Sequence, residues 1–95
     1  MKKELLYFYL PGCPYCRQAD RVLEKMLNEA EFARIALRRV DETKESALAE
    51  QYDYWYVPCI WDGKRKLYEA HPGESAAETE QLLRKVFAEC LNEGL

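Results

Sequence analysis

The sequence predicts a single α/β domain with a mixed four-stranded sheet and helices on both of its faces. Three observations indicate this fold class: an unbroken apolar run at residues 5–10, two long stretches of helical periodicity, and an Asp-Gly pair at residues 62–63 between two short apolar segments. An apolar strand is typical of a sheet centre that is covered on both faces. The opening strand–helix–strand implies a parallel pair with a right-handed crossover, and the Asp-Gly pair implies an antiparallel hairpin.

The first half of the chain supplies two strands and two helices. Residues 4–10 form the first expected strand, and residues 34–40 form the second. A helix is expected from Pro14, because proline suits the first helical turn, where its missing N–H is not needed. A short helix should then run through Tyr52, with Asp41 or Thr43 as its N-cap. The first helix is expected to bury a stripe formed by Ala19, Val22, Leu23, Met26, Leu27 and Ala30, and the second to turn Ala47, Leu48 and Tyr52 inward.

The second half supplies a hairpin and the last helix. Residues 59–61 and 66–70 are the expected hairpin strands, and Pro72-Gly73 breaks the second one. The segment Ser75-Ala76-Ala77-Glu78 has the form of a capping box, in which Ser75 is the N-cap and Glu78 reaches back to it. Gly94 is expected to stop this helix. Its predicted apolar stripe is Leu82, Leu83, Val86, Phe87, Cys90 and Leu91. The expected order over residues 1–95 is βαβαββα.

Composition excludes several function classes. The chain has 95 residues, a net charge of -3 and 48% hydrophobic residues, as expected for one folded domain. The slight acidity argues against a general nucleic-acid binder, which needs a basic surface. No apolar run approaches the ~20 residues of a membrane span, and the run at residues 5–10 is too short for a signal peptide. We therefore expect a cytoplasmic monomer without nucleic-acid or membrane partners.

The segment Cys13-Pro14-Tyr15-Cys16 carries the expected chemistry. Cys13 lies between a buried strand and a helix, where free N–H groups and the helix dipole favour an anion, here the thiolate that attacks disulfides. Cys16 follows one turn later on the same side of the helix, so it is expected to resolve the mixed disulfide. Pro14 stiffens the geometry of the pair.

Other roles for the cysteines are weaker. A structural zinc site usually needs four ligands, and the remaining candidates Cys59, Cys90 and His71 form no second close pair. We therefore predict no metal. Cys59 is expected as a buried small residue, with a third redox thiol as the alternative, and Cys90 belongs to the helix stripe. His71 is expected in a turn, with no partner visible in the sequence.

The segment from Leu10 to Cys16 resembles the active site of the glutaredoxins, whose usual dithiol motif is Cys-Pro-Tyr-Cys. Val57-Pro58 resembles the Val-Pro step of that family, in which the proline is cis, and Gly73 resembles the glycine that ends its fourth strand. The resemblance implies a thioredoxin-like fold and reduction of protein disulfides or glutathione mixed disulfides.

The resemblance also implies site residues and partners. Cys13 would be the nucleophile, Tyr15 would lie beside the substrate, and the backbone of Val57 before Pro58 would pair with it. Glutathione is a possible cosubstrate with no other cofactor, and glutathione or a reductase would donate electrons. In the expected glutathione corner, Gly73-Glu74-Ser75 replaces the usual double glycine, small residue and aspartate. There Ser75 offers a hydroxyl and Glu74 adds negative charge.

Two further possibilities stay open at this point. The aromatic run Tyr54-Trp55-Tyr56 is expected either to form a substrate groove beside Cys13 or to anchor its loop. The functional alternatives to an enzyme are a module that binds a metal or an iron–sulfur cluster through Cys13, and a noncatalytic docking domain.

Overall fold

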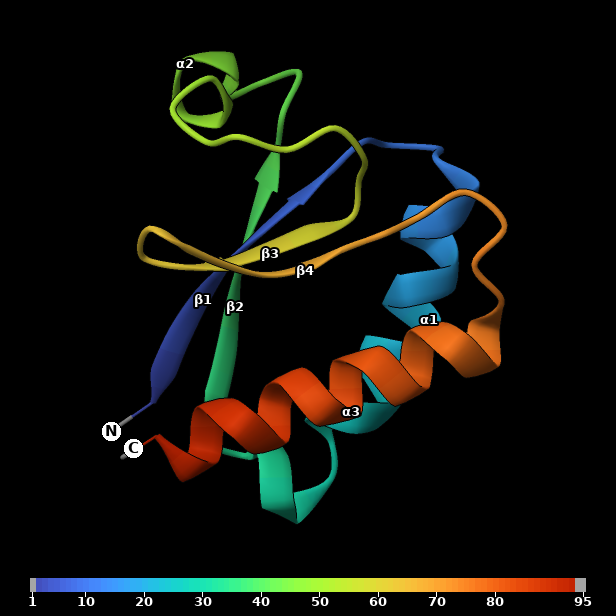
Figure 1. Ribbon diagram of the computed structural model, residues 1–95, viewed down its shortest axis with the longest axis vertical. Helices are drawn as coiled ribbons and strands as arrows, with labels where there is room; N and C mark the ends of the chain where they lie inside the picture. The colour runs from blue at the N-terminus through green and yellow to red at the C-terminus, as the bar shows by residue number, and fades with distance from the viewer. Residues whose placement is uncertain (1, 94–95) are drawn as a thin grey trace.

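The computed structural model describes residues 2–93, and its centre is one four-stranded sheet (Figure 1). The order of strands and α-helices is βαβαββα, as the sequence predicts, with one additional turn of 3-10 helix. The elements are β1 (Lys3–Tyr9), α1 (Pro14–Leu27), η1 (Ala30–Phe32), β2 (Ile35–Asp41), α2 (Ser46–Ala49), β3 (Cys59–Asp62), β4 (Arg65–Glu69) and α3 (Ala76–Asn92).

The sheet is mixed, with the strand order β2-β1-β3-β4. β1 and β2 pair in parallel over their whole length, from Lys3 opposite Ile35 to Tyr9 opposite Asp41. β3 runs antiparallel to both β1 and β4. The two inner strands are therefore β1 and β3, and the carboxyl end of β1 leads directly into the loop that carries Cys13.

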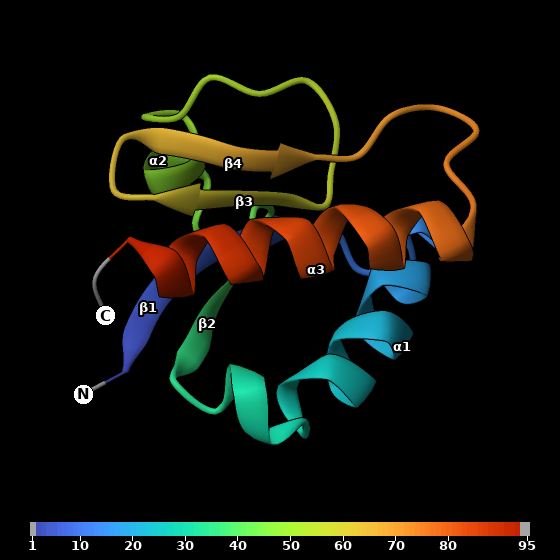
Figure 2. The ribbon, with the colours of Figure 1, turned by 60° about the horizontal axis from the view of Figure 1, so that its bottom comes forward.

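One face of the sheet is covered by α1 and α3, which lie together on the same side (Figure 2). Leu5 and Tyr7 of β1 point to this face and are fully buried. The ring of Phe87 on α3 meets that of Phe32 edge-to-face, with 5.5 Å between the ring centroids. The helices contribute Val22, Leu23, Met26, Leu83, Phe87 and Cys90 to this core.

The opposite face is covered by α2 and the loop that follows it. Phe8, the neighbour of Tyr7, turns to this side and is fully buried against Val40 of β2 and Cys59 of β3. The rings of Tyr52 and Tyr54 pack on Phe8 with centroid distances of 5.0 and 5.2 Å. β1 is thus buried on both faces, which confirms the prediction for this strand.

The predicted cap of α2 is wrong. α2 begins later, at Ser46, and its N-cap residue is Glu45, whose side chain makes no capping hydrogen bond. The carboxylate of Asp41 instead accepts hydrogen bonds from the N–H and the hydroxyl of Thr43, at 2.9 and 2.6 Å. Asp41 and Thr43 therefore form a local turn at the end of β2, which competes with helix formation.

Two residues of the predicted apolar stripes lie on the surface. Ala30 and Ala47 are both exposed, because Ala30 starts η1 instead of extending α1, and α2 is too short to bury a full stripe. The hairpin turn is shifted by one residue to Gly63-Lys64, because Asp62 still pairs with Arg65. Gly63 has a positive φ of 59°, a conformation that glycine adopts without strain.

The capping box of α3 forms only in part. The hydroxyl of Ser75 accepts a hydrogen bond from the N–H of Glu78 at 3.2 Å, as predicted. The carboxylate of Glu78 does not reach back, because it pairs with the ring of His71 at 2.8 Å. His71 therefore has the partner that the sequence did not reveal. The predicted stop at Gly94 lies outside the described residues, within which no helix is long and apolar enough to cross a membrane.

Phe87→Ala is expected to lower the free energy of unfolding by about 3–5 kcal/mol, because it removes a fully buried ring and leaves a cavity. Urea unfolding followed by far-UV circular dichroism measures this change. Lys85→Ala on the exposed side of the same helix is the control and should change the value by less than about 0.5 kcal/mol. Equal effects of the two substitutions would contradict the assigned core.

Candidate functional site

Cys13 and Cys16 lie at the junction between the central strand and the first helix. After β1 the chain turns through Pro11 and Gly12, and Gly12 has a φ of 80°, which is favourable only for glycine. Cys13 is the N-cap residue of α1, with an extended backbone, and its carbonyl accepts the first helical hydrogen bond from Arg17 at 2.9 Å. Pro14 is the first helical residue, as predicted. Both thiols are free.

The two thiols occupy different environments. Cys13 is half-buried and open to solvent, whereas Cys16, one turn deeper, is only 2% exposed. Burial is the main reason why the pKa of the Cys16 thiol is raised to about 12. A hydrogen bond with Cys13 and the charges of Cys13 and Asp20 contribute in the same direction, whereas a backbone hydrogen bond at Leu10 opposes them. Cys16 therefore stays a protonated thiol at neutral pH. The pair consists of one accessible sulfur and one sheltered sulfur.

A polar cluster next to Cys16 joins α1 to the sheet. The hydroxyl of Tyr7 donates a hydrogen bond to Asp20 at 3.1 Å, and the guanidinium of Arg39 donates one to the same carboxylate oxygen at 2.6 Å. Burial first, and then the charges of Asp20 and Cys16, raise the pKa of Tyr7 well above its usual range. Asp20 lies four residues after Cys16 and hence on the same helix face, a spacing that is visible in the sequence.

The peptide bond between Val57 and Pro58 is cis, as the family resemblance implied. Pro58 is buried and its carbonyl accepts a hydrogen bond from Ala70 at 3.0 Å. Among the hydrogen bonds of residues 2–93, none uses the N–H or the C=O of Val57. The backbone at Val57 is thus left with free polar groups, which an extended polypeptide can pair with.

The expected glutathione corner is closed by internal contacts. The N–H of Gly73 donates a hydrogen bond to the hydroxyl of Tyr15 at 2.7 Å. The carboxylate of Glu74 is buried and accepts hydrogen bonds from the hydroxyls of Tyr68 and Thr79. The hydroxyl of Ser75 is engaged by its own helix. The polar groups of Gly73, Glu74 and Ser75 are therefore occupied by other residues of the chain.

A second side chain of α1 holds this corner in place. The amide of Gln18 donates hydrogen bonds to the carbonyl of Glu74 at 3.0 Å and to the hydroxyl of Thr79 at 3.2 Å. Together with Tyr15, Gln18 ties the start of α3 to the first turns of α1. The inward orientation of Glu74 was not visible in the sequence, because its partners Tyr68 and Thr79 are brought to it by the β4–α3 connection.

The other two cysteines are interior residues. Cys59 is fully buried, its sulfur accepts a hydrogen bond from the indole of Trp61 at 3.1 Å, and burial raises its pKa to about 12. Cys90 is 3% exposed in the α3 core, and burial raises its pKa as well. Within residues 2–93, no three His, Cys, Asp or Glu side chains converge in a way that would hold a metal ion.

The aromatic run divides into one packed and two exposed side chains. Tyr54 packs on Phe8, while Trp55 is 86% and Tyr56 52% exposed. The carboxylate of Glu69 accepts hydrogen bonds from the N–H groups of Trp55 and Tyr56, at 2.5 and 2.7 Å. The loop is therefore anchored, as one of the two interpretations has it, and the substrate groove beside Cys13 stays a prediction.

Comparison with known proteins agrees with this geometry. The family model described as thioredoxin matches residues 1–87. The chain belongs to the thioredoxin family. Among curated relatives, thioredoxin-related transmembrane protein 4 of Mus musculus is 27% identical over 74 residues, which is 78% of this chain and 22% of the mouse protein. The chain thus spans about a fifth of the length of that relative.

Solved thioredoxins share the fold. The thioredoxin Mala s 13 of Malassezia sympodialis superposes with a TM-score of 0.68 at 15% identity, covering 90% of this chain and 72% of the other. Thioredoxin-2 of the malaria parasite gives a TM-score of 0.61 at 25% identity, covering 86% and 81%. Thioredoxin-fold relatives are thiol–disulfide oxidoreductases, and Cys13 and Cys16 form a close pair in this chain. The finer resemblance to glutaredoxins stays a prediction.

Alkylation should distinguish the four thiols of this thioredoxin-family chain. At pH 7 the reduced protein is expected to react quickly with iodoacetamide at Cys13 alone, because the other three thiols are buried and their raised pKa values leave almost no thiolate. Peptide mass spectrometry after a short pulse measures the modified positions. Cys13→Ser should lose the fast phase and Cys90→Ser should keep it. Fast labelling of Cys59 or Cys90 in the folded protein would contradict the assigned burial.

Proposed function

We propose that this protein reduces protein disulfides, with Cys13 as the attacking thiol and Cys16 as the resolving thiol. The observation that carries the proposal is the unequal burial of the two sulfurs across one helical turn. An accessible sulfur is suited to attack, because a substrate disulfide can reach it from the solvent. The buried sulfur of Cys16 cannot be reached by a free substrate, so it reacts only with the mixed disulfide that has formed at Cys13.

The first step is attack of the Cys13 thiolate on one sulfur of the substrate disulfide. A bond forms between Cys13 and that sulfur, and the second substrate sulfur leaves as a thiolate that takes up a proton. The free N–H and C=O of Val57 lie on the backbone next to buried Pro58 and pair with the substrate chain on one side of the bond. The substrate is then held as a mixed disulfide.

The second step depends on a change in the pKa of Cys16. Burial keeps that pKa high, but the hydrogen bond with Cys13 and the charge of Cys13 also contribute to it. Both of these contributions disappear when Cys13 is bonded to substrate and is no longer an anion. Cys16 then loses its proton more readily, attacks the sulfur of Cys13 and displaces the substrate sulfur bonded to it, which takes up a proton and leaves as a thiol. Two electrons have passed to the substrate, and Cys13–Cys16 is a disulfide.

The closed corner at residues 73–75 favours a polypeptide substrate over glutathione. Glutathione needs free N–H groups and a positive or neutral surface for its carboxylates. Here the N–H of Gly73 is already bound to Tyr15, and Ser75 caps its own helix. A polypeptide needs only the open backbone at Val57 and the aromatic side chains beside it.

We propose a dithiol reductase of the thioredoxin type as the electron donor, and a cytoplasmic monomer as the working form.

Reduction of insulin disulfides tests this proposal. With NADPH and a thioredoxin-type reductase, the wild-type protein is expected to turn over insulin, and Cys13→Ser to reduce the rate at least about 1,000-fold, because the attacking thiolate is lost. Cys16→Ser should accumulate a mixed disulfide with substrate, visible as a covalent adduct on non-reducing gels. Cys90→Ser is the matched control and should keep the wild-type rate.

The same proteins are also assayed with glutathione as the electron donor, and these assays can contradict the proposal. We expect reduction of 2-hydroxyethyl disulfide by glutathione and glutathione reductase to stay near the uncatalysed rate. If turnover with glutathione is as fast as, or faster than, turnover with the thioredoxin-type reductase, the proposed electron donor is wrong. Anaerobically purified protein could instead carry an iron–sulfur chromophore or stoichiometric zinc bound through Cys13. If it did so and did not turn over insulin, the result would favour a metal-binding module over an enzyme.

A further inference from the structure

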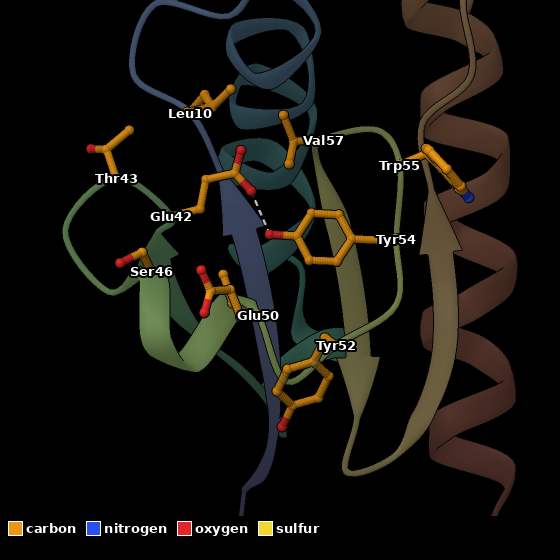
Figure 3. Close-up of a pocket in the computed structure, with 10 residues that line it drawn as sticks. Leu10, Glu42, Thr43, Ser46, Glu50, Tyr52, Tyr54, Trp55 and Val57 are labelled. Atoms are coloured by element: carbon orange, nitrogen blue, oxygen red, sulfur yellow. Dashed lines mark hydrogen bonds between the residues drawn. The ribbon is translucent and has the colours of Figure 1, made fainter.

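A groove of about 520 Å³ lies beside the Cys13 loop, on the sheet face that α1 and α3 do not cover. It is formed between the α2 segment and the loop that leads to Pro58 (Figure 3). Leu10, three residues before Cys13, and Val57, directly before Pro58, both line it. The groove is therefore continuous with the proposed substrate position. It is also lined by Glu42, Ala49, Glu50, Tyr52, Tyr54 and Trp55.

The charges in this groove are all negative. Glu42 and Glu50 both line it, and no lysine, arginine or histidine does. Within residues 2–93, neither carboxylate forms an ion pair, and Lys44 on the neighbouring turn is exposed outside the groove. Two unpaired carboxylates in one concave surface favour a cationic group from outside the chain.

The carboxylate of Glu42 has a fixed orientation. The hydroxyl of Tyr54 donates a hydrogen bond to one of its oxygens, and the ring of Tyr54 is held in turn by stacking on buried Phe8. Figure 3 shows Tyr54 pointing across the groove toward Glu42, whereas the indole of Trp55 points away from it. A half-buried carboxylate held in this way loses little freedom when it pairs with a cation.

The walls are suited to a long side chain that ends in a cation. Leu10, Ala49 and Val57 provide apolar surface, and the tyrosine rings provide faces that attract cations. Lysine and arginine combine an apolar stem with a charged head, which matches apolar walls with carboxylates beyond them. A metal ion would need converging ligands, which the described residues lack.

We infer that this groove selects protein disulfides that carry an arginine or lysine close in sequence to the attacked cysteine. The inference rests on the proposed function, because it uses the substrate chain that Cys13 and Val57 hold. The basic side chain enters between Glu42 and Glu50 while the cysteine lies at Cys13. Acidic residues at the same substrate position meet like charge and are disfavoured.

A series of disulfide-linked peptides tests the inference. The peptides differ only in one residue, arginine or glutamate, placed at successive positions on either side of the cysteine. At the best position the wild-type protein should reduce the arginine peptide with a kcat/KM about fivefold above that of the glutamate peptide, which is about 1 kcal/mol and near the upper end for a solvent-accessible ion pair. The preference should decrease as ionic strength rises.

Two double variants localise the effect. Glu42→Gln with Glu50→Gln should bring the ratio close to one, and the glutamine oxygen at position 42 can still accept the hydrogen bond from Tyr54. The matched control, Glu24→Gln with Glu89→Gln, changes the net charge equally at exposed positions on α1 and α3 and should keep the preference. An unchanged preference in the Glu42/Glu50 variant, or its loss in the control, would overturn the groove as its source.

Separate readouts distinguish this inference from the proposed function. Equal rates on the arginine and glutamate peptides at every position, with normal insulin reduction, would overturn the inference and leave the function standing. A redox-inert arginine peptide, with serine in place of its cysteine, tests the groove alone by NMR titration. Shifts confined to Leu10 and residues 42–57 support it, and their absence overturns it even if no disulfide is reduced.

Discussion

Burial of β1 on both faces is the constraint on which the rest of the structure depends. Leu5 and Tyr7 require the cover of α1 and α3, and Phe8 requires the aromatic loop on the other side. The helical layer and the aromatic loop therefore each exclude water from one face of this strand. The strand ends at Tyr9, and one short turn connects it to Cys13 at the start of α1. The reactive sulfur thus lies at the surface, a few residues beyond a strand that is buried on both faces.

The same constraint explains the different roles of the two thiols. Cys16 lies on the face of α1 that packs against the sheet, while Cys13 at the N-cap is outside the helical repeat. One turn of helix thus separates a solvent environment from a core environment. The polar cluster of Tyr7, Asp20 and Arg39 shows that the core next to Cys16 is nevertheless not purely apolar.

Much of this arrangement could be predicted from the sequence, because it depends on local pattern. The buried strand, the helix start at Pro14 and the position of Cys13 follow from periodicity and the chemistry of proline. The features that were missed depend on residues brought together by folding. Asp41 turned to Thr43 instead of capping α2, and Glu74 turned inward to the hydroxyls of Tyr68 and Thr79. Such choices among polar partners are decided by tertiary packing, which no single-sequence pattern contains.

The interior positions of Cys59 and Cys90 have a consequence for how this fold can be observed. One thiol lies in the core under the aromatic loop, and the other lies in the core between α3 and the sheet. Each becomes reactive only when its own layer opens, so the chain carries a chemical reporter on either side of β1. Labelling rates at the two positions compare the local opening free energies of the two layers. If the layers open together, the domain is one cooperative unit. If Cys59 is labelled first, the layer beside the proposed groove is the one that separates.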